Sequence, residues 1–297
     1  MTEQLLLPLP QSAEFARTFA AMGRPLRLCK RECRRRVRML WQVQSRRFRL
    51  FGRVDLVSRG PVADNAEDLM EWAATWRHWH DGRPFVLNAD GIAPQILRAN
   101  GFWPLMTPAT LALLDLDAPA TMRQAMQQKW RNRLNRAEGA DLRVIRRPLA
   151  ADDWLLTAEA EQARARRYRG MPPAFATAFA AANPGLAQVF EARHRGTPVA
   201  AALMLRHGRM ATWQIGHSTP EGRKLNAMNL VLWHAMEALQ ADGHEQIDLG
   251  ILNAQDAAGL TRFKLGTGAR AHQLGGTWLH LGSLAPLARL LPDRMLR

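Results

Sequence analysis

The chain has 297 residues and a mass of 33.4 kDa, a length that allows one large domain or two of about 150 residues each. Its hydrophobic fraction of 47% and charged fraction of 23% are those of a globular protein and exclude wholesale disorder. Two cysteines are too few for a disulfide scaffold, so we expect a reducing, cytoplasmic compartment. The formal net charge of +15 predicts an anionic partner.

The basic charge is concentrated in two stretches of the sequence. Residues 24–59 hold thirteen basic residues against two acidic ones, and residues 123–147 hold eight against two. Only four of the 41 basic residues are lysines, an arginine preference that codon bias in a GC-rich genome explains. Codon bias does not explain where the charges lie. The two stretches are therefore interpreted either as solvated arginine faces or as surfaces that attract a phosphate-bearing ligand.

The N-terminal part of the chain alternates helices and strands. Ser12 and Asn65 are predicted to cap two helices, because their side chains accept hydrogen bonds from free backbone N–H groups of the first turn. The expected elements are a helix at 11–22, three extended stretches between 26 and 56, a helix at 66–80, a strand at 84–88, a helix at 92–100 and a strand at 110–116.

A strongly basic helix is predicted next, at 121–138, and the alternation then continues. The expected elements are a strand at 142–146, helices at 152–167 and 173–182, an antiparallel meander at 189–193, 198–206 and 210–217, an apolar helix at 225–241, a strand at 246–249, a helix at 256–263 and a strand at 272–280. This order predicts an α+β fold with mixed, largely antiparallel sheets rather than a doubly wound parallel sheet.

The sequence contains no predicted membrane-spanning segment, since no stretch approaches the about 20 apolar residues that such a helix requires. Residues 1–10 lack a cationic start and contain Pro8, so we expect no signal peptide. In the segment 281–297, leucines keep helical spacing beside three arginines. This segment allows either a helix that docks on the protein or a peripheral contact with a membrane.

Two stretches of the sequence carry a resemblance to a known family. The first contains Lys-Trp-Arg-Asn at 129–132, and the second contains Gly-His-Ser-Thr-Pro-Glu-Gly-Arg at 216–223, Ile-Asp-Leu-Gly at 247–250 and Arg-Phe-Lys-Leu-Gly at 262–266. Together they resemble the Fem-type peptidyltransferases and the related acetyltransferase-like proteins of the GNAT superfamily. The resemblance spans nearly the whole chain. It implies tandem GNAT-like domains at 1–120 and 141–297, joined by a basic helix at 121–140.

The resemblance also implies a reaction. Members of this group move an acyl or aminoacyl group from an activated ester or thioester to an amine, in a cleft associated with the second domain. We therefore expect an N-acyltransferase with acyl-CoA or aminoacyl-tRNA as co-substrate and no permanently bound cofactor. Lys264 matches the family lysine that holds the donor's phosphate or the developing oxyanion. A lysine ammonium is a compact charge suited to that role in a partly dry cleft.

The sequence departs from ordinary acetyl-CoA-binding GNAT proteins at the phosphate loop. Their loop carries two glycines and cradles the pyrophosphate with backbone amides at a helix N-terminus, whereas residues 222–229 contain one glycine. Arg223, Lys224 and the helix N-terminus near Asn226 are predicted to bind the phosphate instead. Tyr168, the only tyrosine, lies far along the chain from these motifs. Either water protonates the leaving group, or the leaving group is a ribose hydroxyl.

An attacking amine must lose a proton to a base. Asp248, His217 and Glu221 are the candidates, and Asp248 has the best expected position, where two strands of a GNAT cleft separate. A purely structural alternative is that Asp248 caps the turn into Gly250.

Side chains of the basic helix are assigned to binding. Lys129, Arg131 and Arg133 are predicted to face an anionic donor or acceptor. No metal site is expected, since His78 and His80 are two residues apart near a solvent-facing helix end and do not share a face.

The alternative function is a non-catalytic protein that binds nucleic acid or an anionic membrane on a GNAT fold. The basic stretch 24–59 supports it, but that stretch has few aromatic stacking platforms and no nucleic-acid motif. For the enzyme, the expected partners are a phosphate-bearing acyl donor and an amine acceptor, with no stable protein partner. The variant Lys264→Ala distinguishes the two functions, because a loss of turnover with retained binding supports the acyltransferase.

Overall fold

The computed structural model describes residues 5–33, 36–49, 52–78, 80–166 and 171–291. Tyr168 and the two arginines nearest the C-terminus, Arg294 and Arg297, lie outside the described residues. The chain divides into two compact units, one made of Met1–Thr110 with Gln273–Arg297 and the other of Leu111–His272. Within the described residues, no helix combines the length and the apolar character needed to cross a membrane.

The first unit contains a sheet with the strand order β1-β2-β3-β5-β14-β6, and β4 pairs with β2. Its strands are β1 (Arg27–Cys33), β2 (Arg36–Phe48), β3 (Gly52–Ser58), β4 (Val62–Ala63), β5 (Phe85–Asn88), β6 (Phe102–Met106) and β14 (Thr277–His280). Its helices are the 3-10 turns η1 (Leu9–Gln11) and η2 (Trp76–His78), and α1 (Ala13–Ala21), α2 (Ala66–Thr75), α3 (Pro94–Ala99) and α11 (Ala285–Arg289).

Capping residues that the sequence predicts mark the start of two helices of this unit. The hydroxyl of Ser12 accepts a 3.1 Å hydrogen bond from the N–H of Phe15, and Oδ1 of Asn65 accepts one of 2.8 Å from the N–H of Asp68. Both predicted caps are confirmed. The core of the unit is aromatic, since Trp72, Trp76, Phe85 and Phe102 are fully or almost fully buried between the sheet and α2.

The end of α2 differs from the prediction. The α-helix stops at Thr75 and a 3-10 turn follows, so the chain after it turns inward. His80 is buried, with its Nε2 3.5 Å from Oδ2 of the buried Asp55. The expectation of a solvent-facing helix end holds for Arg77 and His78, which are exposed, but not for His80, which packs against Trp76 in the core.

The second unit contains a sheet with the strand order β13-β7-β12-β11-β10-β9-β8. Its strands are β7 (Thr110–Asp115), β8 (Leu142–Pro148), β9 (Ala187–His194), β10 (Thr197–His207), β11 (Met210–Ser218), β12 (Gln246–Ile251) and β13 (Arg270–Gln273). Its helices are α4 (Pro119–Ala125), α5 (Gln128–Glu138), α6 (Trp154–Arg166), α7 (Pro173–Ala182), α8 (Pro220–Lys224), α9 (Ala227–Ala241) and α10 (Ala258–Gly266).

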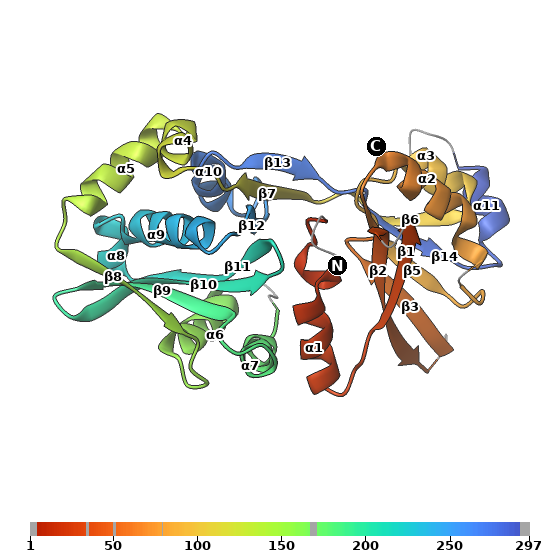
Figure 1. The fold of residues 1–297 in the computed structure, drawn as a ribbon, viewed down its shortest axis with the longest axis horizontal. Coiled ribbons are helices and arrows are strands. Elements are labelled where there is room, and N and C mark those ends of the chain that lie inside the picture. Colours follow the sequence, from red (N-terminus) through yellow and green to blue (C-terminus); the bar gives the residue numbers. More distant parts are fainter. Residues whose placement is uncertain (1–4, 34–35, 50–51, 79, 167–170, 292–297) are drawn as a thin grey trace. The chain divides into compact units, whose positions relative to one another are not determined.

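Helices cover both faces of the second sheet. Helices α5 and α9 lie on one face, and α6 and α7 lie on the other (Figure 1). The strands β9, β10 and β11 form the predicted antiparallel meander, and β12 pairs with β11 in parallel. Small residues of β10, such as Ala200 and Ala202, let the apolar face of α9 approach the sheet closely.

The limits of the two units differ from the predicted domain limits. Residues 111–120 belong to the second unit, because β7 pairs with β12. Residues 273–297 belong to the first, because β14 pairs with β5 and β6. The predicted single strand at 272–280 is two strands in two different sheets. The chain turns between them at Gly276, whose φ of +85° lies in the left-handed region that favours glycine.

The predicted basic helix at 121–138 is also divided in two. Met126 and Gln127 have extended backbone angles, so α4 ends and α5 begins anew. The guanidinium of Arg131 donates to the carbonyl oxygens of Arg123 and Gln124, both at 3.3 Å, and so satisfies the free carbonyl end of α4. A single helix would have no free carbonyls at this point for Arg131 to bind.

Candidate functional site

The strands β11 and β12 separate at one point of the second sheet. Their pairing covers Met210 to Thr212 on β11, and its last pair joins Thr212 to Asp248. Beyond it β11 continues along β10 to Ser218, whereas β12 stays beside β7, where Ile251 lies opposite Leu111. The register between β10 and β11 shifts next to this point, at Leu203. Such a bulge bends and twists a strand, which contributes to the separation.

Asp248 and Lys264 lie beside this separation. Asp248 is 3% exposed, and its Oδ1 accepts a 2.7 Å hydrogen bond from the N–H of Gly250. Lys264 of α10 is 7% exposed, and its Nζ donates a 2.9 Å hydrogen bond to the carbonyl oxygen of Ile251. Burial lowers the pKa of Lys264 to about 8, although the nearby Asp248 carboxylate acts in the opposite direction. A buried cation of this kind can change its protonation state near neutral pH.

The two stretches that carried the family resemblance meet here. Phe263 packs between Trp130 of α5 and Trp213 of β11, with ring centroids 5.8 Å and 6.0 Å away. A Cβ on Gly266 would lie 2.7 Å from Cδ1 of Trp130, so glycine is needed for α10 to approach α5. The N–H of Gln127 also donates to the carbonyl oxygen of Gly266 at 3.0 Å. These contacts hold α10, and with it Lys264, against α5 and β11.

The segment between β11 and α9 carries the predicted phosphate-binding residues. Arg223 and Lys224 are exposed on α8, and the guanidinium of Arg223 donates to the carbonyl oxygen of Ser218. Gly222 is needed here for packing, since a Cβ would lie 2.2 Å from the carbonyl oxygen of Val199 on β10. The one glycine of the loop therefore lets α8 approach the sheet.

That helix, α9, begins at the predicted place. Asn226 is its N-cap, with a left-handed φ of +55° and no capping hydrogen bond from its side chain. Asn229, in the first turn, is 4% exposed, and no described residue accepts a hydrogen bond from its Nδ2. Side chains in a helix lean toward its N-terminus, so this amide leans toward the free backbone N–H groups. An anion at the helix start would satisfy these donors.

His217 lies at the other end of β11 from the separation. Thr212 pairs with Asp248, and His217 is five residues further along β11, which corresponds to about 16 Å of strand. The structure therefore brings Asp248 and Lys264 together and places His217 nearer the α8 end, next to Ser218. Glu221, the third candidate base, is 3.0 Å from Nδ1 of His194.

A buried carboxylate that the sequence analysis did not single out lies on the same face of the sheet as His217. Ala201 of β10 lies opposite both Glu191 of β9 and His217 of β11, so the three side chains share one face. Trp154 of α6 covers them: its indole N–H donates to Glu191 at 2.8 Å, and its ring lies edge-on to His217 with centroids 5.9 Å apart. The signal in the sequence was a glutamate in the middle of an apolar strand.

On α5, the three predicted binding residues differ in their surroundings. Lys129 and Arg133 are exposed and, four residues apart, share one face of the helix. Arg131 is half-buried and donates to the carbonyl oxygens at the end of α4. Its guanidinium is thus already used within the unit, while Lys129 and Arg133 present their charges to solvent.

Several basic residues of the stretch 24–59 in the first unit are paired with carboxylates. Five of these ion pairs have separations between nitrogen and oxygen of 2.6 Å to 3.7 Å: Arg27–Asp55, Lys30–Glu32, Arg31–Glu71, Arg36–Asp64 and Arg38–Asp68. Local pairing lowers the field that a distant polyanion would meet. Over the described part of the chain, no group of three or more histidine, cysteine, aspartate or glutamate side chains could hold a metal ion.

Comparison with known proteins agrees with this geometry. The family model described as Acetyltransferase (GNAT) domain matches residues 120–273, which is more than half of the chain. No curated protein gives a significant match to the sequence.

Solved structures share the fold at low identity. The crystal structure of FemX is 14% identical with a TM-score of 0.77, over 98% of this chain and 96% of that one. A conserved protein of unknown function from Bacteroides thetaiotaomicron is 12% identical with a TM-score of 0.55, over 90% and 89%. L-PGS from Bacillus licheniformis is 12% identical with a TM-score of 0.51, over 96% and 92%.

The predicted α+β fold with two GNAT-like units is confirmed. The chain belongs to the GNAT acetyltransferase family and has the Fem-type fold of that family.

Proposed function

We propose that the protein is an N-acyltransferase that moves an acetyl or aminoacyl group from acyl-CoA or aminoacyl-tRNA to an amine by direct attack. The observation that carries this proposal is the separation of β11 from β12 beyond Thr212 and Asp248, with the buried ammonium of Lys264 beside it. In the reaction, the amine nitrogen forms a bond to the acyl carbon. The bond from that carbon to the donor's sulfur or oxygen breaks, and the leaving group takes a proton from water, which is restored by the proton that the amine gives up to the base.

Lys264 and Asp248 have different roles in the proposed reaction at the acyl carbon. The oxygen of the acyl group becomes negative as the amine attacks, and a preoriented cation in a dry site stabilises that charge. Lys264 is such a cation while it is protonated, and the carbonyl oxygen of Ile251 orients its Nζ. Asp248 accepts the proton that the amine loses. Its hydrogen bond from Gly250 N–H holds the carboxylate in place, so capping the turn and acting as the base are compatible.

The donor's phosphate is assigned to the start of α9. The side chains of Arg223 and Lys224 supply positive charge, and the backbone N–H groups after Asn226 supply donors along the helix dipole. His217 lies near this end of β11, so we assign it to the donor side of the cleft with the base role as its alternative. We assign Lys129 and Arg133 to the binding of an anionic part of either substrate.

A donor assay tests this function. The protein is incubated separately with radiolabelled acetyl-CoA and with labelled aminoacyl-tRNA, each with a panel of small primary amines, and label in the amine is counted. Transfer from one donor supports the proposal and identifies that donor. If neither transfers label, the acetyl-CoA and aminoacyl-tRNA donors named here are wrong.

A second assay tests the residue that carries the chemistry. We expect Lys264→Ala to lower kcat by about 100-fold to 1,000-fold, the cost of removing one preorganised oxyanion donor, with donor binding retained in equilibrium dialysis. Lys224→Ala is the matched control and should weaken donor binding while kcat at saturation stays near the wild-type value. Unchanged turnover in Lys264→Ala would remove Lys264 from the mechanism.

A further inference from the structure

An apolar surface at one edge of the first unit has no role in the proposed reaction. Strand β6 is the last strand in the order of its sheet, and α11 packs against it. Four large side chains stand out on these two elements: Leu105 is 49% exposed, Met106 68%, Leu287 56% and Leu290 80%. We call these four residues the apolar edge. Such a cluster is unusual on a protein surface and marks an interaction site.

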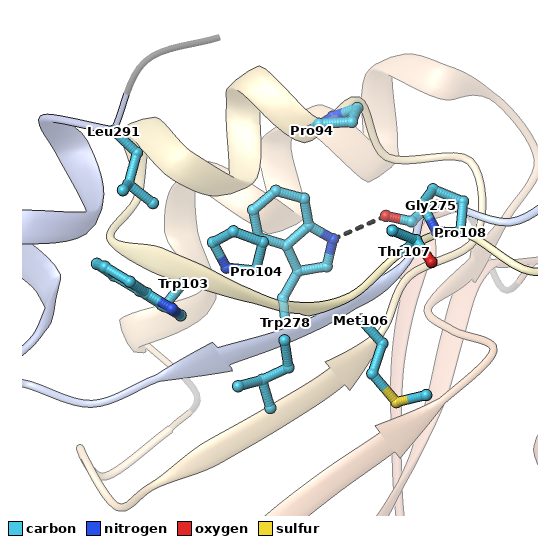
Figure 2. Close-up of a pocket in the computed structure, with 10 residues that line it drawn as sticks. Pro94, Trp103, Pro104, Met106, Thr107, Pro108, Gly275, Trp278 and Leu291 are labelled. Carbon is cyan, nitrogen blue, oxygen red and sulfur yellow. Dashed lines mark hydrogen bonds between the residues drawn. The ribbon is translucent and has the colours of Figure 1, made fainter. Parts of the chain in front are cut away.

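A cavity of about 250 Å³ opens within this edge. Its lining consists of Pro94, Trp103, Pro104, Leu105, Met106, Thr107, Pro108, Gly275, Trp278 and Leu291. Figure 2 shows the indole of Trp278 in the middle of the lining, with Pro104 and Trp103 to one side and Leu291 beyond them. The indole N–H donates to the carbonyl oxygen of Gly275 at 2.7 Å. Because this hydrogen bond satisfies the indole N–H, Trp278 presents the carbon atoms of its ring to the cavity.

The size and lining of the cavity limit what it can hold. Its volume is below the about 300–1,000 Å³ usual for small-molecule sites, so it accepts one apolar chain rather than a whole ligand. Leu291 directly follows Leu290 and lines the cavity together with Leu105 and Met106. The cavity is therefore bordered by Leu105 and Met106 of the apolar edge and by Leu291, which follows α11.

The two segments that supply this surface carry charges of one sign. Residues 91–110 and 273–291, which supply β6, α11 and most of the cavity, contain Arg98 and Arg289 and no aspartate or glutamate. Arg289 is exposed in the last turn of α11, and the guanidinium of Arg98 donates to the carbonyl oxygen of Leu291. In the stretch 24–59, by contrast, several of the cations are paired with carboxylates.

We propose that the apolar edge docks on an anionic lipid bilayer, with an acyl chain entering the cavity. Exposed leucine and methionine side chains beside arginines are the composition that binds at a membrane interface, since apolar burial and attraction to anionic headgroups act together. A second copy of the chain fits the surface less well, because it would bring Arg289 of one copy near Arg289 of the other without a carboxylate between them. This docking does not depend on the acyl-transfer chemistry.

Vesicle sedimentation with the full chain tests the proposal. Vesicles of phosphatidylcholine with about 30% phosphatidylglycerol are compared with vesicles of phosphatidylcholine alone. We expect wild type to bind the anionic vesicles, and to keep part of that binding at high salt because the apolar contribution is not screened. Leu290→Glu and Met106→Glu should each weaken binding at least tenfold. Both positions are exposed, so the variants should keep the wild-type circular dichroism and melting curve.

Leu28→Glu is the matched control, because Leu28 is 61% exposed on β1 of the same unit and lies within the basic stretch. It makes the same change in charge away from the apolar edge and should bind vesicles as wild type does. An equal loss in Leu28→Glu would overturn the proposal in favour of electrostatic binding by the basic stretch. Absence of vesicle binding by wild type would also overturn it, as would a dimer in light scattering that Leu290→Glu dissociates.

The cavity has its own test. Lipid with brominated acyl chains quenches the fluorescence of tryptophans that contact those chains, and Trp103 lines the cavity. We expect bound wild type to be quenched more strongly than bound Trp103→Phe. Equal quenching of the two proteins would contradict entry of an acyl chain into the cavity.

Discussion

Trp154 and Glu191 are joined by a hydrogen bond of 2.8 Å from the indole N–H to Oε2. Glu191 is fully buried, and its carboxylate also accepts from Nη2 of Arg147 and Nε of Arg193, both at 2.7 Å. Burial raises the pKa of Glu191, but the hydrogen bonds from Arg147, Trp154 and Arg193 outweigh it, so the pKa lies below its usual value. The sheet face beneath α6 is thus organised around an ionised glutamate.

The first prediction concerns stability at low pH. Because the pKa of Glu191 is lower in the folded state, its stabilising effect is present above the unfolded pKa of about 4.3 and is lost as pH falls through the folded value. We expect Glu191→Gln to lower the free energy of unfolding by about 1–3 kcal/mol at pH 7, and the difference from wild type to shrink below pH 4. Urea unfolding at both pH values measures this. In the control Glu245→Gln, which breaks an exposed pair with Arg209, the change should stay within about 0.5 kcal/mol.

The second prediction concerns alkaline stability. The pKa of Lys264 is about 8 in the folded protein, below the value of 10.5 in an unfolded chain. Between these two values the unfolded state binds more protons, so this group makes the folded state more stable as pH rises from about 8 to 10.5. Wild type should gain up to about 3 kcal/mol relative to Lys264→Met across that window. A constant difference between the two proteins in urea unfolding at pH 7.5 and pH 10 would contradict the buried ammonium.

The third prediction concerns Gly222. Its Cβ would meet the backbone carbonyl oxygen of Val199 at 2.2 Å, which no side-chain movement can relieve. We expect Gly222→Ala to cost about 1–3 kcal/mol, the usual range for overpacking, and to weaken donor binding because α8 must shift. The control is Gly259→Ala on α10, where a Cβ meets nothing within 4 Å. It should be neutral or stabilising, since alanine favours a helix over glycine. Thermal melting and equilibrium dialysis with the donor measure both effects.

The fourth prediction separates two neighbouring arginines. Arg131 satisfies carbonyl oxygens at the end of α4, whereas Arg133 is exposed. Arg131→Ala should lower the free energy of unfolding by about 1 kcal/mol, the usual worth of a helix cap, with a smaller effect on substrate affinity. Arg133→Ala should leave stability unchanged and raise the KM of an anionic substrate. The reverse pattern in melting curves and steady-state kinetics would exchange the two roles.

Local features of the chain were predictable from the sequence. The helix caps at Ser12 and Asn65 could be predicted because a capping side chain accepts a hydrogen bond from a backbone N–H only two or three residues away. The start of α9 at Asn226 and the turns of the meander follow from equally short-range signals. The resemblance to the Fem-type group rested on short motifs, and it led to the same family as the match over residues 120–273.

The candidate site was predictable only in part. Asp248 and Lys264 were both named, and the structure places them together, because β12 and α10 are close in sequence and in space. His217 was grouped with them, yet it lies about 16 Å of strand beyond Thr212, the residue that pairs with Asp248. Trp154 and Glu191 went unnamed, since their contact joins a helix to a strand 37 residues away.

The sequence by itself determined where several helices begin, that the chain is α+β, and where its charge lies along the chain. Only the tertiary structure decided which sheet each strand joins. Residues 270–280 read as one extended stretch, but β13 and β14 pair with partners more than a hundred residues away and lie in different sheets. It also decided which arginines of residues 24–59 meet carboxylates. Pairing and burial depend on contacts between distant segments, and no local pattern of residues encodes those contacts.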